Sequence, residues 1–401
     1  MSIYRMMPYA DVTEDIIILK DGSMSVIYEI RSTTGYDTLT LAERGRLSTE
    51  IDAMLSNFYP YVSVQIINDY YVTRYEPDKK LQETEILQVL HDSRDKKYSE
   101  REFNEHEIYL SLNFNPGAKK AKTSPLKHIA MAAKKEVADI QDIKHQIASL
   151  FTITESFLSA NNIAFKQLNT EELKKLLARY INSMPKSVID GMEFRMSGYA
   201  ANYELCMKEY VVSKQEFQIG DEFIGVISLT LLPEWSQPYN RHEQNYVVPL
   251  LHPVLNGITF PHRTVVTIKT TNKNQEINAL KNDAKINKSF AGKDEKAQKK
   301  IQEVHEVIDE AVKMHKDLTY CGVKILISDL DKKELKHKTD KVLLSLNKVI
   351  GAVGYYEKID AMPLFLSCLP GAQASDYRTF LMKSENAADF VSIHKYYQGD
   401  I

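Results

Sequence analysis

Cysteines, long apolar runs and secretion signals are scarce or missing in this sequence. Its 401 residues contain three cysteines, Cys206, Cys321 and Cys368, and no Cys-x-x-Cys spacing. This supports neither a disulfide framework nor a four-thiolate zinc site. The apolar runs have the length of strands, far below the roughly 20 residues that cross a bilayer. The N-terminus shows no apolar signal region, so we expect a protein of the cytoplasm.

A nucleotide-binding loop is missing too. A P-loop needs Gly-x-x-x-x-Gly-Lys-[Ser/Thr], so that backbone N–H groups surround the phosphates. The pair Gly292-Lys293 is followed by Asp294 and has no upstream glycine at the required spacing. The run Val323–Asp329 ends in an aspartate, like the magnesium-binding strand of nucleotide motors, but without a P-loop we interpret Asp329 as a turn residue and Asp331 as a helix cap. No catalytic residue and no ATP or magnesium site is predicted in this chain.

Patterns for metals and nucleophiles are equally weak. His242, His252 and His262 lie ten residues apart, which gives no pair at the i, i+4 separation of a helical zinc site. Cys321 and Cys368 lie in apolar runs, where a thiol is usually buried and inert. The sequence therefore predicts no metal, no cofactor and no nucleophile.

The composition is that of an ordinary globular protein, with 43% hydrophobic and 26% charged residues. A net charge of −3 argues against a surface that attracts nucleic acid or membrane as a whole. Positive charge is concentrated locally: residues 117–135 hold six lysines and no acid, and residues 269–300 hold nine lysines against four acids. These stretches are either solvated helix faces or contacts to DNA phosphate or an acidic membrane surface. The candidate contacts are Lys119, Lys120, Lys122, Lys281, Lys285 and Lys288.

The first half of the chain alternates β-rich runs with helical patterns. An Asp-Gly pair predicts a tight turn between its first two strands, and capping boxes predict where two helices begin. Strands are expected at 16–20, 24–31, 61–75, 107–114 and 164–167, and helices from Thr40 to Pro60, from Ser124-Pro125 to Leu158 and from Asn169 to Ile181.

The second half follows the same rough plan without a visible sequence repeat. Its lysine-rich segment, about 274–317, carries apolar residues at helical spacing and is interrupted by Phe290-Ala291-Gly292, so it forms either an antiparallel helical hairpin or one continuous arm. We predict an α+β fold with two mixed sheet-plus-helix subdomains, residues 1–200 and 201–401. Strands are expected at 222–232, 263–269, 320–328, 354–359 and 362–368, and a capped helix from Asp331 to Val349.

Several segments resemble the N-terminal half of the TraC-like ATPases, of the CagE, TrbE and VirB type, which energise conjugative type IV secretion. The strand Arg263–Thr270 before the lysine-rich arm is similar to a family element. The most telling part is the end, which resembles the segment directly before the family's motor domain. The similar segments are Tyr4–Tyr9, Ile16–Arg31, Phe365–Gly371, Ser384–Ala388 and Gly399.

The resemblance implies a protein whose C-terminal RecA-like motor hydrolyses ATP with magnesium. Its N-terminal part would dock on inner-membrane secretion components and help to build a hexamer. Because the chain stops at Ile401, where the motor should begin, the family's catalytic residues have no counterpart here. We expect a non-catalytic docking and assembly region of a type IV secretion ATPase, cytoplasmic and peripheral at the inner-membrane face, which acts in conjugative DNA transfer.

Candidate interface residues come from an aromatic loop and from the segment that resembles the family. Trp235 and Tyr239 can anchor an interface, since such side chains bury a large area at small entropic cost, or they can fill a gap in the core. Leu369, Pro370 and Gly371 are the other candidates. A rival hypothesis is a non-specific DNA-binding protein of a conjugation system that uses the lysine-rich helices, and a third is an ATPase with a divergent site.

Overall fold

The computed structural model describes residues 3–31, 39–74, 85–99, 102–114, 136–194, 201–214, 216–232, 249–255, 257–291, 317–373 and 376–395, with scattered positions between 298 and 313. The strands are β1 (Tyr9–Thr13), β2 (Ile16–Leu19), β3 (Met24–Ile30), β4 (Val62–Arg74), β5 (Glu102–Phe114), β6 (Phe165–Gln167), β7 (Tyr210–Val212), β8 (Phe217–Ile219), β9 (Glu222–Leu231), β10 (His262–Thr270), β11 (Leu318–Asp329), β12 (Val353–Glu357) and β13 (Phe380–Lys383). The helices are α1 (Ile3–Met6), α2 (Leu41–Ser56), α3 (Glu85–Ser99), α5 (Glu136–Ala160), α6 (Thr170–Asn182), α7 (Lys186–Asp190), α8 (Ala201–Leu205), α9 (His252–Leu255), α10 (Lys273–Ala291), α12 (Lys332–Ile350), α13 (Ala361–Ser367) and α14 (Ser384–Ala388).

The predicted α+β class is confirmed, and both capping boxes are present. The Thr40 side chain accepts a hydrogen bond from the Glu43 backbone N–H, and the Glu43 carboxylate accepts one from the Thr40 N–H in return. Asn169 and Glu172 make the same exchange at the start of α6. Each exchange satisfies two backbone donors that a helix start leaves free. Local chemistry therefore sets where α2 and α6 begin.

The strand predicted at 362–368 is wrong, because the chain forms helix α13 there. The helix has seven residues, and Met362, Leu364 and Phe365 are buried in it. Pro363 lies in its first turn, where a missing N–H breaks no intrahelical hydrogen bond. A short apolar run fits a buried strand or a buried helix equally well, and only its surroundings decide between them. Ten further described elements were not predicted from the sequence: helices α1, α3, α7, α8, α9 and α14 and strands β1, β7, β8 and β13.

All described strands form one 13-stranded sheet, and it contains the same topology twice. In the first half the order β6-β3-β5-β4 is antiparallel throughout. In the second half the order β12-β9-β11-β10 is antiparallel throughout. Each set follows the chain order β-α-β-β-α-β, with α2 and α5 in the first and α9 and α12 in the second. Both halves are thus ferredoxin-like units.

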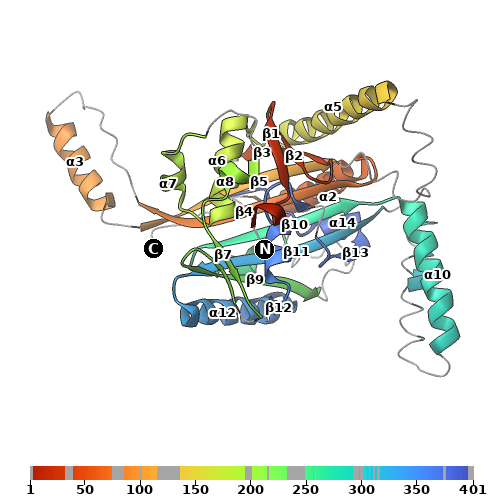
Figure 1. Ribbon diagram of the computed structural model, residues 1–401. Coiled ribbons are helices and arrows are strands. Elements are labelled where there is room, and N and C mark those ends of the chain that lie inside the picture. The colour runs from red at the N-terminus through yellow and green to blue at the C-terminus, as the bar shows by residue number, and fades with distance from the viewer. Residues whose placement is uncertain are drawn as a thin grey trace.

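The two units join through equivalent strands. β4 pairs with β10 antiparallel, with Ile66 opposite Val266 near the middle of the ladder. Equivalent strands that pair antiparallel are related by an approximate twofold axis through the sheet. This relation places the insertions between the second and third strand of each unit at opposite ends of the molecule, and Figure 1 shows α3 and α10 projecting in opposite directions. The sheet is continuous across the predicted boundary at residue 200.

The predicted arm at 274–317 folds back on itself. Ile277 and Leu280 of α10 pack in one apolar cluster with Val304 and Ile308. Residues that far apart on a single straight helix could not meet, because each residue adds about 1.5 Å of length. The antiparallel hairpin is therefore the correct alternative. Among the helices in the described ranges, none combines the length and the apolar character of a membrane-spanning segment.

Helices cover both faces of the sheet. One core contains side chains from α2, α5, α9 and α12, and the other contains side chains from α6, α7, α8 and α13. The C-terminal segment contributes to both cores, since Phe365 lies in the second and Phe390 in the first. Strand β13 lies between these two residues in the chain and pairs with β11.

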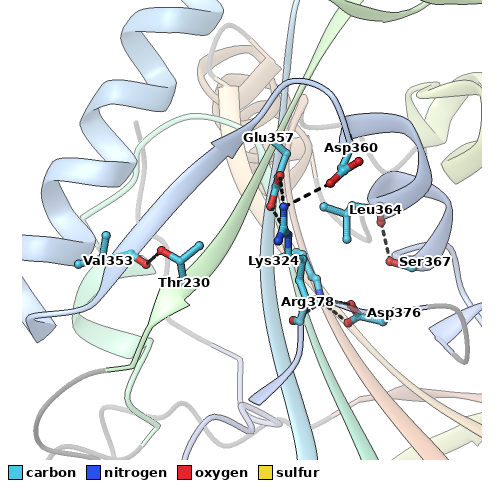
Figure 2. A network of polar contacts seen from close by, with 9 residues as sticks. All are labelled: Thr230, Lys324, Val353, Glu357, Asp360, Leu364, Ser367, Asp376 and Arg378. Atoms are coloured by element: carbon cyan, nitrogen blue, oxygen red, sulfur yellow. Dashed lines mark hydrogen bonds and ion pairs between the residues drawn. The ribbon is translucent and has the colours of Figure 1, made fainter. Parts of the chain in front are cut away.

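A buried ion pair fastens this C-terminal segment to the sheet. The Lys324 ammonium of β11 binds the Asp376 carboxylate, and both side chains are almost fully buried. Lys324 also donates to the Arg378 carbonyl oxygen at 3.1 Å. Arg378 in turn reaches Glu357 at 3.0 Å and Asp360 at 3.3 Å, as Figure 2 shows. The segment after α13 is thus held by charges on β11 and at the end of β12.

Gly322 allows this close approach. A Cβ at Gly322 would lie 2.6 Å from Lys324 Nζ and 2.7 Å from the Arg378 backbone oxygen. Contacts that short force the backbone of the C-terminal segment to move. Glycine is therefore the residue that lets the segment lie directly on β11.

We predict that Lys324→Met lowers the free energy of unfolding by about 3–5 kcal/mol, because it leaves the Asp376 carboxylate buried without its partner. Urea unfolding at pH 7 measures the loss. Lys332→Met is the matched control: Lys332 forms an exposed pair with Glu216, which contributes about 1 kcal/mol or less. Equal losses in the two variants would contradict the assignment.

Candidate functional site: a charged cleft at the junction of the two units

A cleft of about 1030 Å³ lies where the two ferredoxin-like units meet. Its walls come from the ends of β4, β5, β10 and β11 and from the segment around α6 and α7. Charged and aromatic side chains line it. Those used below are Asp69, Tyr71, Glu102, Glu105, Arg179, Tyr180, Lys186, Asp190, Glu222 and Arg263.

The floor of the cleft rests on two neighbouring carboxylates: Asp69 lines the cleft, and Glu107 binds the lining residues Arg179 and Lys186. Asp69 of β4 lies directly opposite Glu107 of β5 in the ladder, an arrangement in which like charges repel. Arg179 of α6 spans them, with 2.7 Å between Nη2 and Asp69 Oδ2 and 2.7 Å between Nη1 and Glu107 Oε2. All three side chains are buried. One guanidinium thus compensates two acids and holds α6 on the sheet.

Two further cations complete this network. Arg263 of β10 lies opposite Asp69 and approaches its Oδ1 to 3.3 Å. Its guanidinium lies 3.3 Å from the centre of the Tyr180 ring, a cation–π contact that adds to the ion pair. Lys186 of α7 binds Glu107 from the other side. The network therefore ties together elements of both units.

Helix α6 places Arg179 and Tyr180 by its own geometry. The helix ends at Ser183, which adopts the left-handed conformation with φ of 47°. Arg179 lies in the last turn, where a positive charge interacts favourably with the helix dipole. Asn182 then fixes the following chain, because its amide oxygen accepts from the Met207 N–H at 2.7 Å and the Lys208 N–H at 3.0 Å.

The surroundings keep Glu107 ionised. Burial by itself would raise the pKa of its carboxyl, but Arg179 and Lys186 outweigh that effect and lower the pKa to about 2. The Tyr109 hydroxyl also donates to Glu107 Oε2 at 2.9 Å. Glu107 therefore carries a fixed negative charge at neutral pH.

Neutral histidines lie next to the cleft floor. Tyr70 is stacked between His106 and His262, with ring centres 4.1 and 4.3 Å apart. Burial lowers the pKa of His106 to about 3 and that of His262 to about 4. Within the described part of the chain, no three histidine, cysteine or acidic residues gather as they would around a metal ion. The stack serves packing between β5, β4 and β10.

The mouth of the cleft is acidic. Glu102, Glu105, Asp190 and Glu222 line it. Glu105 accepts a hydrogen bond from the Tyr71 hydroxyl at 2.6 Å and Glu222 one from the Ser183 hydroxyl at 2.6 Å, so both remain free to attract a cation. The arrangement is suited to binding, since its cations are already paired inside and the carboxylates of Glu105, Asp190 and Glu222 add negative charge outside.

The predicted lysine contacts separate into two groups. Lys281 and Lys285 are exposed on α10. Lys288 belongs to the same helix, but its side chain lies outside the described residues. Outside the described residues, too, are Lys119, Lys120, Lys122, Trp235 and Tyr239. Anionic contacts and an aromatic anchor at these positions stay predictions.

Leu369, Pro370 and Gly371 have internal surroundings. All three are buried. The Pro370 carbonyl oxygen accepts from the Tyr9 hydroxyl at 2.8 Å, and the Gly371 carbonyl oxygen accepts from Ser25 at 3.0 Å. These residues hold the C-terminal segment on the first strands, and an external partner would reach them only if that contact opened.

The predicted burial of Cys321 and Cys368 is confirmed. Burial raises the pKa of both thiols to about 12. Cys206 is also buried, and burial raises its pKa to about 12. At neutral pH these thiols are protonated and are therefore poor nucleophiles.

Sequence reasoning missed the floor of the cleft. In the sequence, Asp69 and Glu107 look like ordinary acids among the other polar residues of β4 and β5. Arg179 lies one turn from Leu176 on the buried face of an amphipathic helix. A charge at an inward-facing position of a strand or helix was the signal available.

More than half of the chain matches a known protein family. The CagE, TrbE, VirB family, component of type IV transporter system, matches residues 161–378, more than half of the chain. This chain belongs to the CagE, TrbE, VirB family. The resemblance inferred from the sequence is confirmed at that level. No curated protein matches the chain.

The family match covers only part of the cleft. It includes Arg179, Lys186 and Arg263, together with Lys324 and Asp376 of the buried pair. Asp69 and Glu107, the acids that these cations bind, precede the matched region. The CagE, TrbE, VirB segment thus supplies the cations and the first unit of the sheet supplies their partners.

We predict that Glu107→Gln lowers the free energy of unfolding at pH 7 by about 3 kcal/mol, because the pKa of Glu107 falls from 4.5 to about 2 on folding. This contribution is present above pH 4.5 and is lost as the pH falls through 2. The difference between wild type and variant should therefore shrink across that window. Urea unfolding at several pH values measures it, with exposed Glu209→Gln as control. Parallel pH curves for wild type and Glu107→Gln would be evidence against the network.

Proposed function

We propose that this chain is the docking and assembly region of a type IV secretion ATPase and has no catalytic role itself. It contacts inner-membrane secretion components, takes part in oligomerisation and lies at the cytoplasmic face of the inner membrane. Membership of the family supports the secretion role. ATP and magnesium belong to the motor domain that the family resemblance implies, since the sequence given contains no P-loop.

The observation that carries this proposal is the exposed apolar surface on α3. Ile86, Val89 and Leu90 are 75%, 63% and 61% exposed, and Leu87 is 48% exposed. They lie within five residues at the start of the helix, which projects from the body in Figure 1. Large apolar side chains gathered at a projecting site are typical of contacts with other proteins or with membranes.

One observation favours the rival DNA-binding function. Lys281 and Lys285 are exposed and lie four residues apart on α10, so they share one face of the projecting hairpin. A helix with such a face can contact phosphates without reading bases. Aromatic side chains for base stacking are rare in the surrounding sequence, which favours binding without sequence preference.

We predict that Ile86→Asp combined with Leu90→Asp abolishes secretion or transfer by the host's own type IV system when the variant replaces the wild-type gene. The charges would be buried at the interface that α3 forms. Transfer frequency is the measurement. Ser93→Asp, exposed on the same helix, is the matched control and should transfer normally.

The stability of the double variant should equal that of the wild type, because the replaced side chains are exposed. Normal transfer by the double variant would count against docking through α3. A loss of transfer that is shared by Ser93→Asp would show that the helix itself, and not its apolar surface, matters.

For the rival function, we predict that binding of a fluorescent DNA duplex to the purified chain, if it occurs, weakens steeply with salt, because each phosphate contact releases a counterion. Anisotropy titrations at about 50 and about 200 mM salt measure how steeply the affinity falls with salt concentration. Lys281→Ala combined with Lys285→Ala should reduce that slope. Absence of binding at the lower concentration removes the rival.

A further inference from the structure

The central strand β10 is shorter than the two strands that flank it. Its pairing with β4 ends at Tyr70, opposite His262, and its pairing with β11 ends at Leu326, opposite Arg263. β4 continues for four residues to Arg74, and β11 continues for three residues to Asp329. We call the space between these two extensions, in line with β10, the notch.

The walls of the notch are held firmly from outside. Residues Tyr71–Arg74 of β4 stay paired with β5. Residues Ile327–Asp329 of β11 stay paired with β9. Because strands lie about 4.8 Å apart, two walls separated by one missing strand are about 10 Å apart. That spacing admits a single extended backbone.

Chain geometry keeps the preceding residues from closing the notch. Pro261 stands immediately before β10 and has no N–H to donate to a neighbouring strand. Phe260 packs into the core on the α9 and α12 side of the sheet. Its carbonyl oxygen lies 2.9 Å from His262 Nδ1. The chain therefore leaves the plane of the sheet just before β10 begins.

The alternation of an antiparallel ladder shows which backbone groups face the notch. Val62 N–H and C=O both bond the Thr270 side chain of β10, so they point toward β10. Every second residue of β4 does the same, which brings Val72 to the notch. The neighbouring ladder then places the N–H and C=O of Ser328 on the opposite wall.

These groups have no partner on that side among the residues that the structure describes. No described strand pairs with Val72 or Ser328 across the notch, and neither makes a backbone hydrogen bond elsewhere. Tyr71, Val72, Thr73, Ile327 and Ser328 all line the cleft. Two free strand edges that face each other are a template for one more strand.

The charge of the cleft indicates which kind of segment could bind in the notch. The three cations that line it are already paired with Asp69 and Glu107. Three other carboxylates at the mouth, those of Glu105, Asp190 and Glu222, leave an excess of negative charge. A segment that carries a lysine or arginine would compensate this charge, whereas an acidic segment or a nucleic acid would be repelled.

We propose that the notch binds an extended, cationic segment of a partner protein. Three or four residues of that segment would pair with Val72 of β4 and Ser328 of β11 and place a basic side chain among Glu105, Asp190 and Glu222. This is strand addition at a sheet edge, in which backbone bonds give affinity and side-chain contacts give selectivity. The proposal rests on the docking function stated above and names the chemistry of one partner.

The test uses the full chain and a random peptide library. Peptides selected by phage display on the immobilised chain are synthesised with a fluorescent label, and their dissociation constants are measured by anisotropy. We expect the selected peptides to be rich in lysine, arginine and β-forming residues. Selection of no peptide, or of acidic ones, overturns the proposal.

Val72→Pro tests the backbone contact, because it removes the N–H that faces the notch. We expect binding at least about tenfold weaker, the loss of one hydrogen bond plus the steric effect of the ring. Val212→Pro is the matched control. Ser213 N–H bonds the carbonyl oxygen of Glu216, directly before β8, so the Val212 N–H points away from the sheet at its outer edge. Equal binding by the wild type and Val72→Pro refutes the strand addition.

A second variant does not depend on proline. Glu105→Gln combined with Asp190→Asn keeps the shape of the mouth and removes two charges. Peptides with lysine or arginine should bind this variant several-fold more weakly, while the same peptides with glutamine in place of the basic residue should bind both proteins alike. An unchanged preference for basic peptides means that the carboxylates do not select the ligand.

These outcomes are separate from a failure of the docking function itself. If Ile86→Asp with Leu90→Asp abolishes transfer but no peptide distinguishes Val72→Pro from Val212→Pro, the notch proposal fails and docking through α3 stands. If peptides bind the notch as expected but the α3 variant transfers normally, the notch proposal stands and docking through α3 fails.

Discussion

The antiparallel pairing of β4 with β10 is the contact on which the rest of the architecture depends. It joins two ferredoxin-like units edge to edge, so that β4 and β10, an edge strand of each unit, pair with each other and both units share one sheet. It also sets Asp69 beside Arg263 and brings the end of β4 past the start of β10. The charged floor of the cleft and the notch above it are both products of this one register.

Burying charge at that junction costs free energy that only complete pairing offsets. Arg179 bridges two acids that would otherwise repel each other, and Arg263 and Lys186 complete the set. The same logic operates at Lys324 and Asp376, where a buried pair holds the C-terminal segment. In both places an element that packs on the sheet is positioned by charge, which fixes orientation better than apolar contact alone.

Local signals were sufficient to predict most elements and insufficient to predict how they meet. The capping boxes at Thr40 and Asn169 and the Asp-Gly turn depend on neighbours within a few residues, so the sequence shows them directly. The ladder between β4 and β10 joins residues about 200 positions apart, and nothing in either strand alone specifies it. Short apolar runs remain ambiguous, as α13 demonstrates, and the charges of Asp69 and Glu107 resemble surface charges until the register is known.

The twofold relation of the units fixes how far apart the two insertions leave the sheet. The two projecting insertions leave the sheet at opposite ends of its central strands, near Arg74 and Thr270. Twelve residues of β4 separate those points, which corresponds to about 40 Å of extended chain. Because a paired strand neither stretches nor bends easily, the sheet keeps the two points of attachment, near Arg74 and Thr270, at a constant separation.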